Sequence, residues 1–129
     1  MKGYTRAGET VPAFTTFAGM FERYEQRHEQ PDFGLPKRWL DGKGKLDLST
    51  PFNFICSADI IGGNSGSPVV NTKGELIGLI FDGNIHSLSG AIAFDDQYSR
   101  AVAVDSRGII EALTKLYDAG AIVQEITGK

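Results

Sequence analysis

The stretch IIGGNSGSPVVN, at residues 60–71, places a serine within a bend rich in glycine. A serine hydroxyl is a good nucleophile only when a base takes its proton and hydrogen-bond donors stabilise the oxyanion that forms. Glycines serve the second need, because a backbone without Cβ atoms can turn several N–H groups toward one point. The pattern predicts Ser65 as a nucleophile, with the backbone N–H groups of Gly63 and Ser65 as the oxyanion hole.

Two other interpretations of this stretch are open on the residue types alone. Gly, Asn and Ser are common in tight turns of β proteins for conformational reasons. A phosphate-binding loop is also rich in glycine, but its GK[ST] ending is absent here, and the following PVV favours a strand over a helix. The tight turn is therefore the main alternative to a nucleophile loop.

The composition bounds the class of protein. The chain has 129 residues, of which 41% are hydrophobic and 22% are charged, as in one globular domain or a piece of a larger one. A net charge of −3 without a Lys/Arg run argues against nucleic acid or an anionic membrane as the main partner. The lone Cys56 can form neither an internal disulfide nor a cysteine zinc cluster, and we expect no metal ion and no cofactor. No apolar run approaches the ~20 residues of a membrane span.

Residues 1–51 are predicted as a helical and connecting segment. Apolar residues recur at steps of three and four between Thr15 and His28, which predicts an amphipathic helix. The following stretch, QPDFGLPKRWLDGKGKLDLSTP, is rich in Pro, Gly and Lys and is typical of connecting chain with one short helical turn.

Residues 52–129 are predicted as a β-barrel portion with a terminal helix. The sequence Asn71-Thr72-Lys73-Gly74 is typical of a hairpin turn, and Asp105 or Ser106 can cap a helix that Gly120 would end. We expect strands at residues 52–58, 68–70, 76–81, 91–94 and 100–104.

Several of these stretches resemble one family. GGNSGSPVV is similar to the GDSGGP loop of trypsin-like peptidases, with Ser65 at the nucleophile position. The longer string DIIGGNSGSPVVNTKGELIGLIFDGNI resembles the bacterial dipeptidyl-peptidases of serine peptidase family forty-six, typified by dipeptidyl-peptidases seven and eleven. LPKRWLDGKGKLDLSTPFNF and RAVAVDSRGIIEALTKLYDA are similar to that family as well, so the resemblance covers nearly the whole chain.

The resemblance implies a fold and an activity. The fold would be mainly β with flanking helices, as the second half of a chymotrypsin/trypsin-like double β-barrel closed by a C-terminal helix. The activity would be serine-type release of dipeptides from the free N-terminus of peptides, through an acyl-enzyme. At Asn64 the trypsin loop has an Asp that pairs with a newly cut N-terminus, so its absence argues against zymogen-type activation. The neutral Asn64 can still brace the loop by hydrogen bonds.

The FDGN segment carries two further implied roles. At the position of Asp82, family members use a carboxylate to hold the free α-amino group of the substrate, and a charge-assisted hydrogen bond suits that task. Without the resemblance, a turn at a strand end with Gly83-Asn84 is the better explanation of Asp82. At the position of Gly83, members that prefer acidic side chains carry Arg. Gly83 leaves an open, uncharged space, which predicts an apolar or otherwise uncharged residue before the cut bond.

The general base is the missing part. In a trypsin-like chain order the base and its orienting carboxylate precede the serine. His28 precedes Ser65 but lies in RYEQRHEQ, which is typical of a solvated helix face, and His86 follows Ser65 at a pocket rim or on the surface. The resemblance instead implies a His and an Asp in an earlier part of a longer chain.

By the same resemblance, these residues are a C-terminal portion that is inactive alone, Met1 lies in mid-protein, and the parent protein is a periplasmic homodimer. If Met1 were the true start, the chain would stay in the cytoplasm, because it begins with no signal segment. Two other functions remain open. One is a non-catalytic peptide-binding or interaction domain derived from a trypsin-like barrel. The other is a small self-sufficient hydrolase that uses His86.

Overall fold

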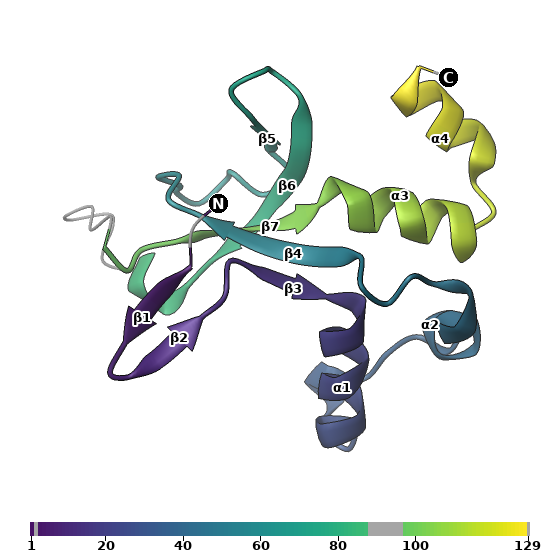
Figure 1. Ribbon diagram of the computed structural model, residues 1–129, viewed down its shortest axis with the longest axis horizontal. Coiled ribbons are helices and arrows are strands. Elements are labelled where there is room, and N and C mark those ends of the chain that lie inside the picture. Colours follow the sequence, from purple (N-terminus) through teal and green to yellow (C-terminus); the bar gives the residue numbers. More distant parts are fainter. Residues whose placement is uncertain (2, 88–96, 129) are drawn as a thin grey trace. The chain divides into compact units, whose positions relative to one another are not determined.

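The computed structural model describes residues 1, 3–87 and 97–128. They belong to two compact units, each built from an early and a late segment of the chain (Figure 1). The first unit comprises Met1–Thr15 and Asn53–Ser106, and the second comprises Thr16–Phe52 and Arg107–Lys129. The domain boundary that we predicted between residues 51 and 52 follows the order of the chain, and it stays a prediction.

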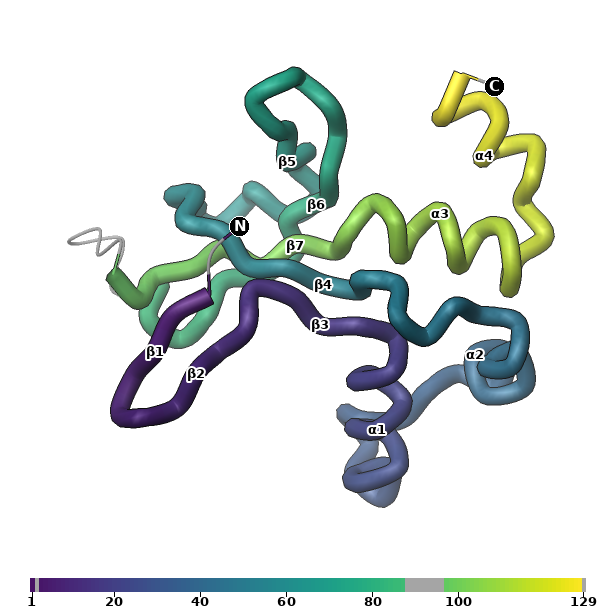
Figure 2. Tube along the Cα trace, in the orientation of Figure 1, coloured from purple at the N-terminus to yellow at the C-terminus, as the bar shows by residue number. Residues whose placement is uncertain are grey.

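The first unit is built on two antiparallel sheets. A hairpin forms the smaller sheet from β1 (Tyr4–Arg6) and β2 (Glu9–Val11). The larger sheet has the strand order β3-β4-β7-β6-β5, and Figure 2 lets the reader follow its path. Its strands are β3 (Phe14–Thr16), β4 (Pro51–Cys56), β5 (Pro68–Val70), β6 (Leu76–Gly83) and β7 (Ala101–Asp105).

Four of the five predicted strands are confirmed, with ends that differ by at most two residues. The hairpin between β5 and β6 is confirmed too, and Gly74 there has a φ of +79°. The predicted strand at 91–94 lies outside the described residues. Strands β1 to β3 were not predicted. Each has only three residues, too few to show an alternating pattern, and Gly8 and Pro12 interrupt the stretch.

The core of the first unit centres on Phe54, whose side chain is 1% exposed. It packs with Ile80, Ala101 and Ala103. The Phe54 ring lies directly over Gly78, where a Cβ atom would meet the ring carbons and the Val104 carbonyl oxygen. A glycine at position 78 therefore lets an aromatic ring sit against the sheet backbone.

Strand β6 carries a β-bulge at Phe81. Ile80 pairs with Ala103 and Asp82 pairs with the next residue of β7, Val102, so Phe81 is the extra residue. Side chains alternate between the two faces of a regular strand, so without the bulge Asp82 would share the buried face of Ile80. The bulge instead puts Asp82 on the opposite face and leaves Gly83 opposite the buried Ala101.

The second unit is helical. Its helices are α1 (Phe17–Arg27), η1 (Pro31–Phe33), α2 (Lys37–Gly42), η2 (Lys43–Lys45), α3 (Ser106–Lys115) and α4 (Gly120–Thr127). The predicted amphipathic helix is confirmed as α1, and its N-cap Thr16 accepts a hydrogen bond from the Gly19 N–H at 3.3 Å. The helix predicted to begin near Asp105 or Ser106 is also confirmed, since α3 begins at Ser106.

Two helical predictions were wrong. The connecting stretch after α1 holds three short helices rather than one turn. Gly120 does not end a helix but begins α4, since α3 stops at Lys115 and Asp118 takes a left-handed φ of +50° between them. The sequence therefore ends in two helices rather than one.

The core of the second unit is aromatic. Phe17 is fully buried, and its ring lies 5.5 Å from the rings of both Trp39 and Phe52. The turn that precedes β4 is held by Asp47, whose carboxylate accepts hydrogen bonds from the Ser49 hydroxyl and backbone N–H. These bonds stabilise the charged form and lower the pKa of Asp47 below its ordinary value of 3.8.

The fold is thus mainly β with flanking helices, as predicted, and its strands form two sheets, while the double β-barrel stays a prediction. Within the described ranges, no helix combines the length and the apolar character needed to cross a bilayer.

Replacing Phe54 with alanine should lower the free energy of unfolding by about 3–5 kcal/mol, because the buried ring leaves a cavity over Gly78. Leu76→Ala on β6 is the control, since Leu76 is 50% exposed, and its effect should stay below about 1 kcal/mol. Chemical denaturation of the two variants checks this. Equal losses would show that Phe54 is not the centre of this core.

Candidate active site

The glycine-rich bend connects β4 to β5 and is braced by Asn64. The Asn64 Oδ1 accepts the Ile61 N–H at 2.8 Å, and the Asn64 N–H donates to the Ile61 carbonyl at 3.2 Å. The Asn64 carbonyl in turn accepts the Ser67 N–H at 2.9 Å. The expectation that a neutral asparagine braces this loop is confirmed.

Two hydrogen bonds join the end of the bend to β6. The Gly66 N–H donates to the Ile80 carbonyl at 2.7 Å, and the Ile80 N–H donates to the Ser67 carbonyl at 2.9 Å. Ser65 directly precedes this pair of bonds, so its place relative to β6 is set by backbone pairing.

Other N–H groups of the bend find no acceptor within the described part of the chain. Among the residues that the structure describes, the N–H groups of Gly62, Gly63 and Ser65 donate to no protein atom. Gly63 has a φ of +103° and Gly66 a φ of +87°, a backbone region that residues with a Cβ rarely adopt. The two donors predicted for an oxyanion hole are therefore available to a ligand.

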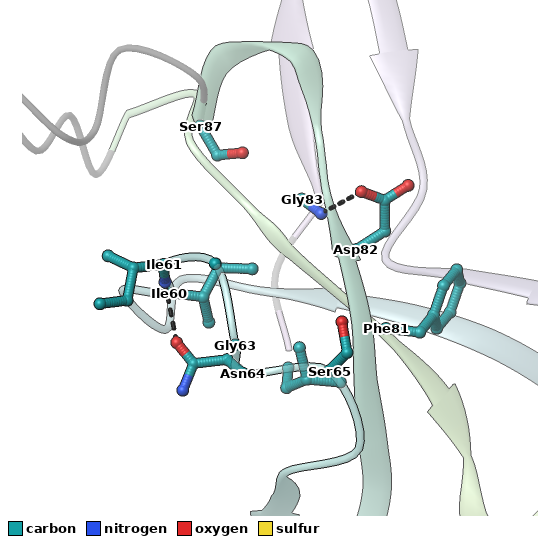
Figure 3. A pocket seen from close by; sticks show the side chains of 11 residues that line it. Ile60, Ile61, Gly63, Asn64, Ser65, Phe81, Asp82, Gly83 and Ser87 are labelled. Carbon is teal, nitrogen blue, oxygen red and sulfur yellow. Dashed lines mark hydrogen bonds between the residues drawn. The ribbon is translucent and has the colours of Figure 1, made fainter.

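The bend borders a pocket of about 340 Å³, shown in Figure 3. It brings together the four residues singled out in the sequence, namely Ser65, Gly63, Asp82 and Gly83. The rest of its lining comprises Ile60, Ile61, Gly62, Asn64, Ile80, Phe81 and Ser87. Ser65 is exposed, so its hydroxyl is accessible from solvent.

Asp82 is the one ionisable side chain among the described residues that line the pocket. Its Oδ1 accepts the N–H of the next residue, Gly83, at 2.8 Å (Figure 3). The carboxylate is exposed, because the bulge at Phe81 turns it away from the core. An exposed carboxylate beside a serine can hold a cationic group of a ligand that reaches the serine.

The space beside Gly83 is not open, in contrast to our prediction. A Cβ at position 83 would overlap the Ser87 hydroxyl and would lie 3.6 Å from the Ile60 Cδ1. The wall of the pocket is thus formed by a serine hydroxyl and a methyl group rather than by empty space. It is uncharged, as predicted.

Neither histidine is placed as a base for Ser65. His86 does not line the pocket; its Nε2 lies 2.8 Å from the Arg6 guanidinium, and its ring lies edge-on to Tyr4. A guanidinium only donates, so it takes up the lone pair that a base would need. His28 is exposed in the second unit, with its Nδ1 3.1 Å from the Tyr24 carbonyl oxygen.

The sequence analysis gave no role to several of the lining residues, among them Ile60, Phe81 and Ser87. Ile60 lies at the start of the glycine-rich bend, and Phe81 directly precedes Asp82. Such adjacency in the sequence is only a weak sign that residues share a pocket. Ser87 follows Gly83 through a tight turn, and only the structure shows that the turn carries it back beside Gly83.

Comparison with known proteins decides the family. A model of the family described as Peptidase S46 matches residues 1–128. The chain belongs to the Peptidase S46 family. It is 39% identical over 127 residues to dipeptidyl-peptidase 7 of Capnocytophaga gingivalis. This match covers 88% of this chain and 17% of that protein. It is also 42% identical over 122 residues to dipeptidyl-peptidase 7 of Phocaeicola vulgatus, with the same coverage.

A solved structure agrees with this Peptidase S46 assignment. DPP11 of Porphyromonas endodontalis, in complex with the dipeptide Arg-Asp, matches with a TM-score of 0.84 at 30% identity. The match covers 97% of this chain and 19% of that one. The family resemblance predicted from the sequence is confirmed, and the chain spans only about a fifth of the length of the relatives that it matches.

Gly62 and Gly63 provide a matched test of the bend. Nothing lies within 4 Å of the position of a Cβ at either residue, but only Gly63 has a positive φ. Gly63→Ala should therefore strain the backbone by about 1–3 kcal/mol and slow labelling of Ser65 by a fluorophosphonate about 5- to 150-fold in the whole protein. Gly62→Ala should change the labelling rate less than about threefold. Equal rates for the two variants would contradict this account of the bend.

Proposed function

We propose that this chain is the nucleophile-bearing C-terminal portion of a serine dipeptidyl-peptidase. In the reaction the Ser65 Oγ gives its proton to the base and attacks the carbonyl carbon of the second peptide bond from a free N-terminus. The C–N bond breaks and the shortened peptide leaves as an amine that receives this proton. Water then hydrolyses the acyl-enzyme and releases the dipeptide. The N–H groups of Gly63 and Ser65 stabilise the oxyanion of each tetrahedral intermediate. The observation that carries this proposal is one pocket that joins Ser65, the Asp82 carboxylate and two N–H donors that have no acceptor among the described residues, in a chain of the Peptidase S46 family.

The Asp82 carboxylate binds the α-ammonium group of the substrate. A charge-assisted hydrogen bond of this kind is stronger than a neutral one, and it selects peptides whose N-terminus is free. The pairing of the bend with β6 supports this role, because it holds Ser65 and Asp82 at a fixed separation. A fixed separation between nucleophile and ammonium site allows an enzyme to remove two residues at a time.

The general base and its orienting carboxylate come from another part of the parent protein. Asp82 is the one ionisable group among the described lining residues, and Arg6 occupies His86, the histidine in the same unit as Ser65. Oxyanion donors without a base leave only residual catalysis, so these 129 residues alone are inactive. Export to the periplasm and a homodimeric parent protein remain predictions from the resemblance.

The pocket takes an apolar or otherwise uncharged side chain before the cut bond. The wall formed by Ile60, Gly83 and Ser87 carries no cation that could pair with a carboxylate. One relative, from Shewanella putrefaciens, is named an Asp/Glu-specific dipeptidyl-peptidase and is 44% identical over 78 residues, covering 60% of this chain and 11% of that protein. We propose that the present chain differs from it in this preference.

Replacing Asp82 with asparagine should lower kcat/KM for a free-amine dipeptide substrate about 10- to 150-fold in the whole enzyme. The reason is the loss of a charged hydrogen bond worth about 1.5–3 kcal/mol. Glu75→Gln, on an exposed residue outside the pocket, is the charge-matched control and should leave kcat/KM unchanged. If Asp82→Asn cleaved free-amine substrates at the wild-type rate, the ammonium site would have to lie elsewhere.

The isolated chain should react with a fluorophosphonate at least ~10³-fold more slowly than the whole enzyme, because the serine lacks its base. Gel fluorescence or intact mass of both proteins, with Ser65→Ala as the blank, measures the two rates. Rapid stoichiometric labelling of the isolated chain at Ser65 would mean that it holds its own base.

A further inference from the structure

The pocket wall at Gly83 is made by a side chain that the proposed function does not yet use. The Ser87 hydroxyl occupies the place that a Cβ at position 83 would take, and the Ser87 Cβ lies 3.2 Å from the same point. Ser87 belongs to the lining of the pocket beside Ser65, and Figure 3 shows its hydroxyl directed toward Gly83. A substrate side chain that enters along this wall therefore meets the Ser87 oxygen.

The proton of this hydroxyl is already committed. The Ser87 Oγ–H donates to the Asn84 carbonyl oxygen at 2.6 Å, and the Ser87 N–H donates to the same oxygen at 2.8 Å. A serine hydroxyl has one proton and two lone pairs. Because the proton points to Asn84, the oxygen offers the pocket acceptor sites and no donor.

Asn84 holds that carbonyl in place through further bonds, of which three go to the residues before β7 and one, at 3.4 Å, goes from its Nδ2 to the Tyr4 hydroxyl. Its N–H donates to the Arg100 carbonyl at 2.9 Å, and its Oδ1 accepts the Arg100 N–H at 3.0 Å. Its Nδ2 donates to the Tyr98 carbonyl at 2.7 Å. Asn84 thus links the end of β6 to the residues before β7, and the Ser87 oxygen cannot turn its proton toward the pocket without losing a bond to this network.

We propose that Ser87 determines which side chain precedes the cut bond, a role that rests on the proposed function. The fixed acceptor favours uncharged side chains with an N–H or O–H donor and admits apolar ones. It disfavours carboxylates, which at neutral pH offer only acceptors.

Leucine, asparagine and aspartate have similar sizes, so three dipeptide substrates that differ only in this residue test the role. In the whole enzyme, Ser87→Ala should lower the ratio of kcat/KM for the asparagine substrate to that for the leucine substrate about 2- to 13-fold, since a neutral hydrogen bond is worth about 0.5–1.5 kcal/mol. The leucine substrate is the internal reference, so a general loss of activity cancels in the ratio. The ratio of kcat/KM for the aspartate substrate to that for the leucine substrate should rise in Ser87→Ala.

Ser57→Ala is the matched control, because Ser57 is exposed and lies outside the pocket lining, and both ratios should be unchanged in it. If Ser87→Ala does not fold, Ser87→Cys keeps a side-chain atom there but weakens the acceptor, and the asparagine ratio should fall again. An unchanged asparagine ratio in a variant that still cleaves the leucine substrate overturns the role of Ser87 alone. A wild-type enzyme that cleaves none of the three substrates overturns the proposed function itself.

Discussion

Two backbone hydrogen bonds at Ile80 determine the geometry of the whole site. Through them the residues that directly follow Ser65 pair with β6, at a point two residues before Asp82. The Ile80 side chain is 5% exposed and packs with Phe54, so the core fixes the position of that pairing. The separation between the serine and the carboxylate is therefore a property of the sheet and does not depend on contacts between the two side chains. In a peptide that binds both groups, the distance from the N-terminus to the bond that Ser65 attacks would therefore be set by the backbone of the sheet.

The bulge at Phe81 gives the end of β6 its two functions. It turns Asp82 away from the buried face and brings Gly83 opposite Ala101, on the face where Ile60 packs. One strand end can thus present a carboxylate to an ammonium group and a neutral wall to a side chain. Because bulges commonly re-aim side chains next to active sites, this irregularity is consistent with a substrate-binding role for β6.

The sequence predicted the bend, its donors and most of the sheet, because glycine and alternating apolar residues report local conformation directly. Asp82 and Gly83 were found only through resemblance to a family, since an Asp-Gly pair at a strand end is common in turns. The role of Ser87 could not be predicted, because it depends on a hydrogen bond that folds residues 84–87 back onto Gly83. The bulge at Phe81 has no sequence pattern of its own. The short strands β1 to β3 and the helix α4 were missed because local composition there is ambiguous.

The central claim is that Ser65 forms a covalent acyl-enzyme with a dipeptide. The most direct test is rapid acid quenching of the whole enzyme during turnover of a dipeptide ester, followed by mass spectrometry of its proteolytic peptides. We predict a dipeptidyl adduct on the peptide that contains Ser65, and none when the substrate amine is acetylated. An adduct on another residue, or the same adduct yield in a Ser65→Ala enzyme, would contradict the account.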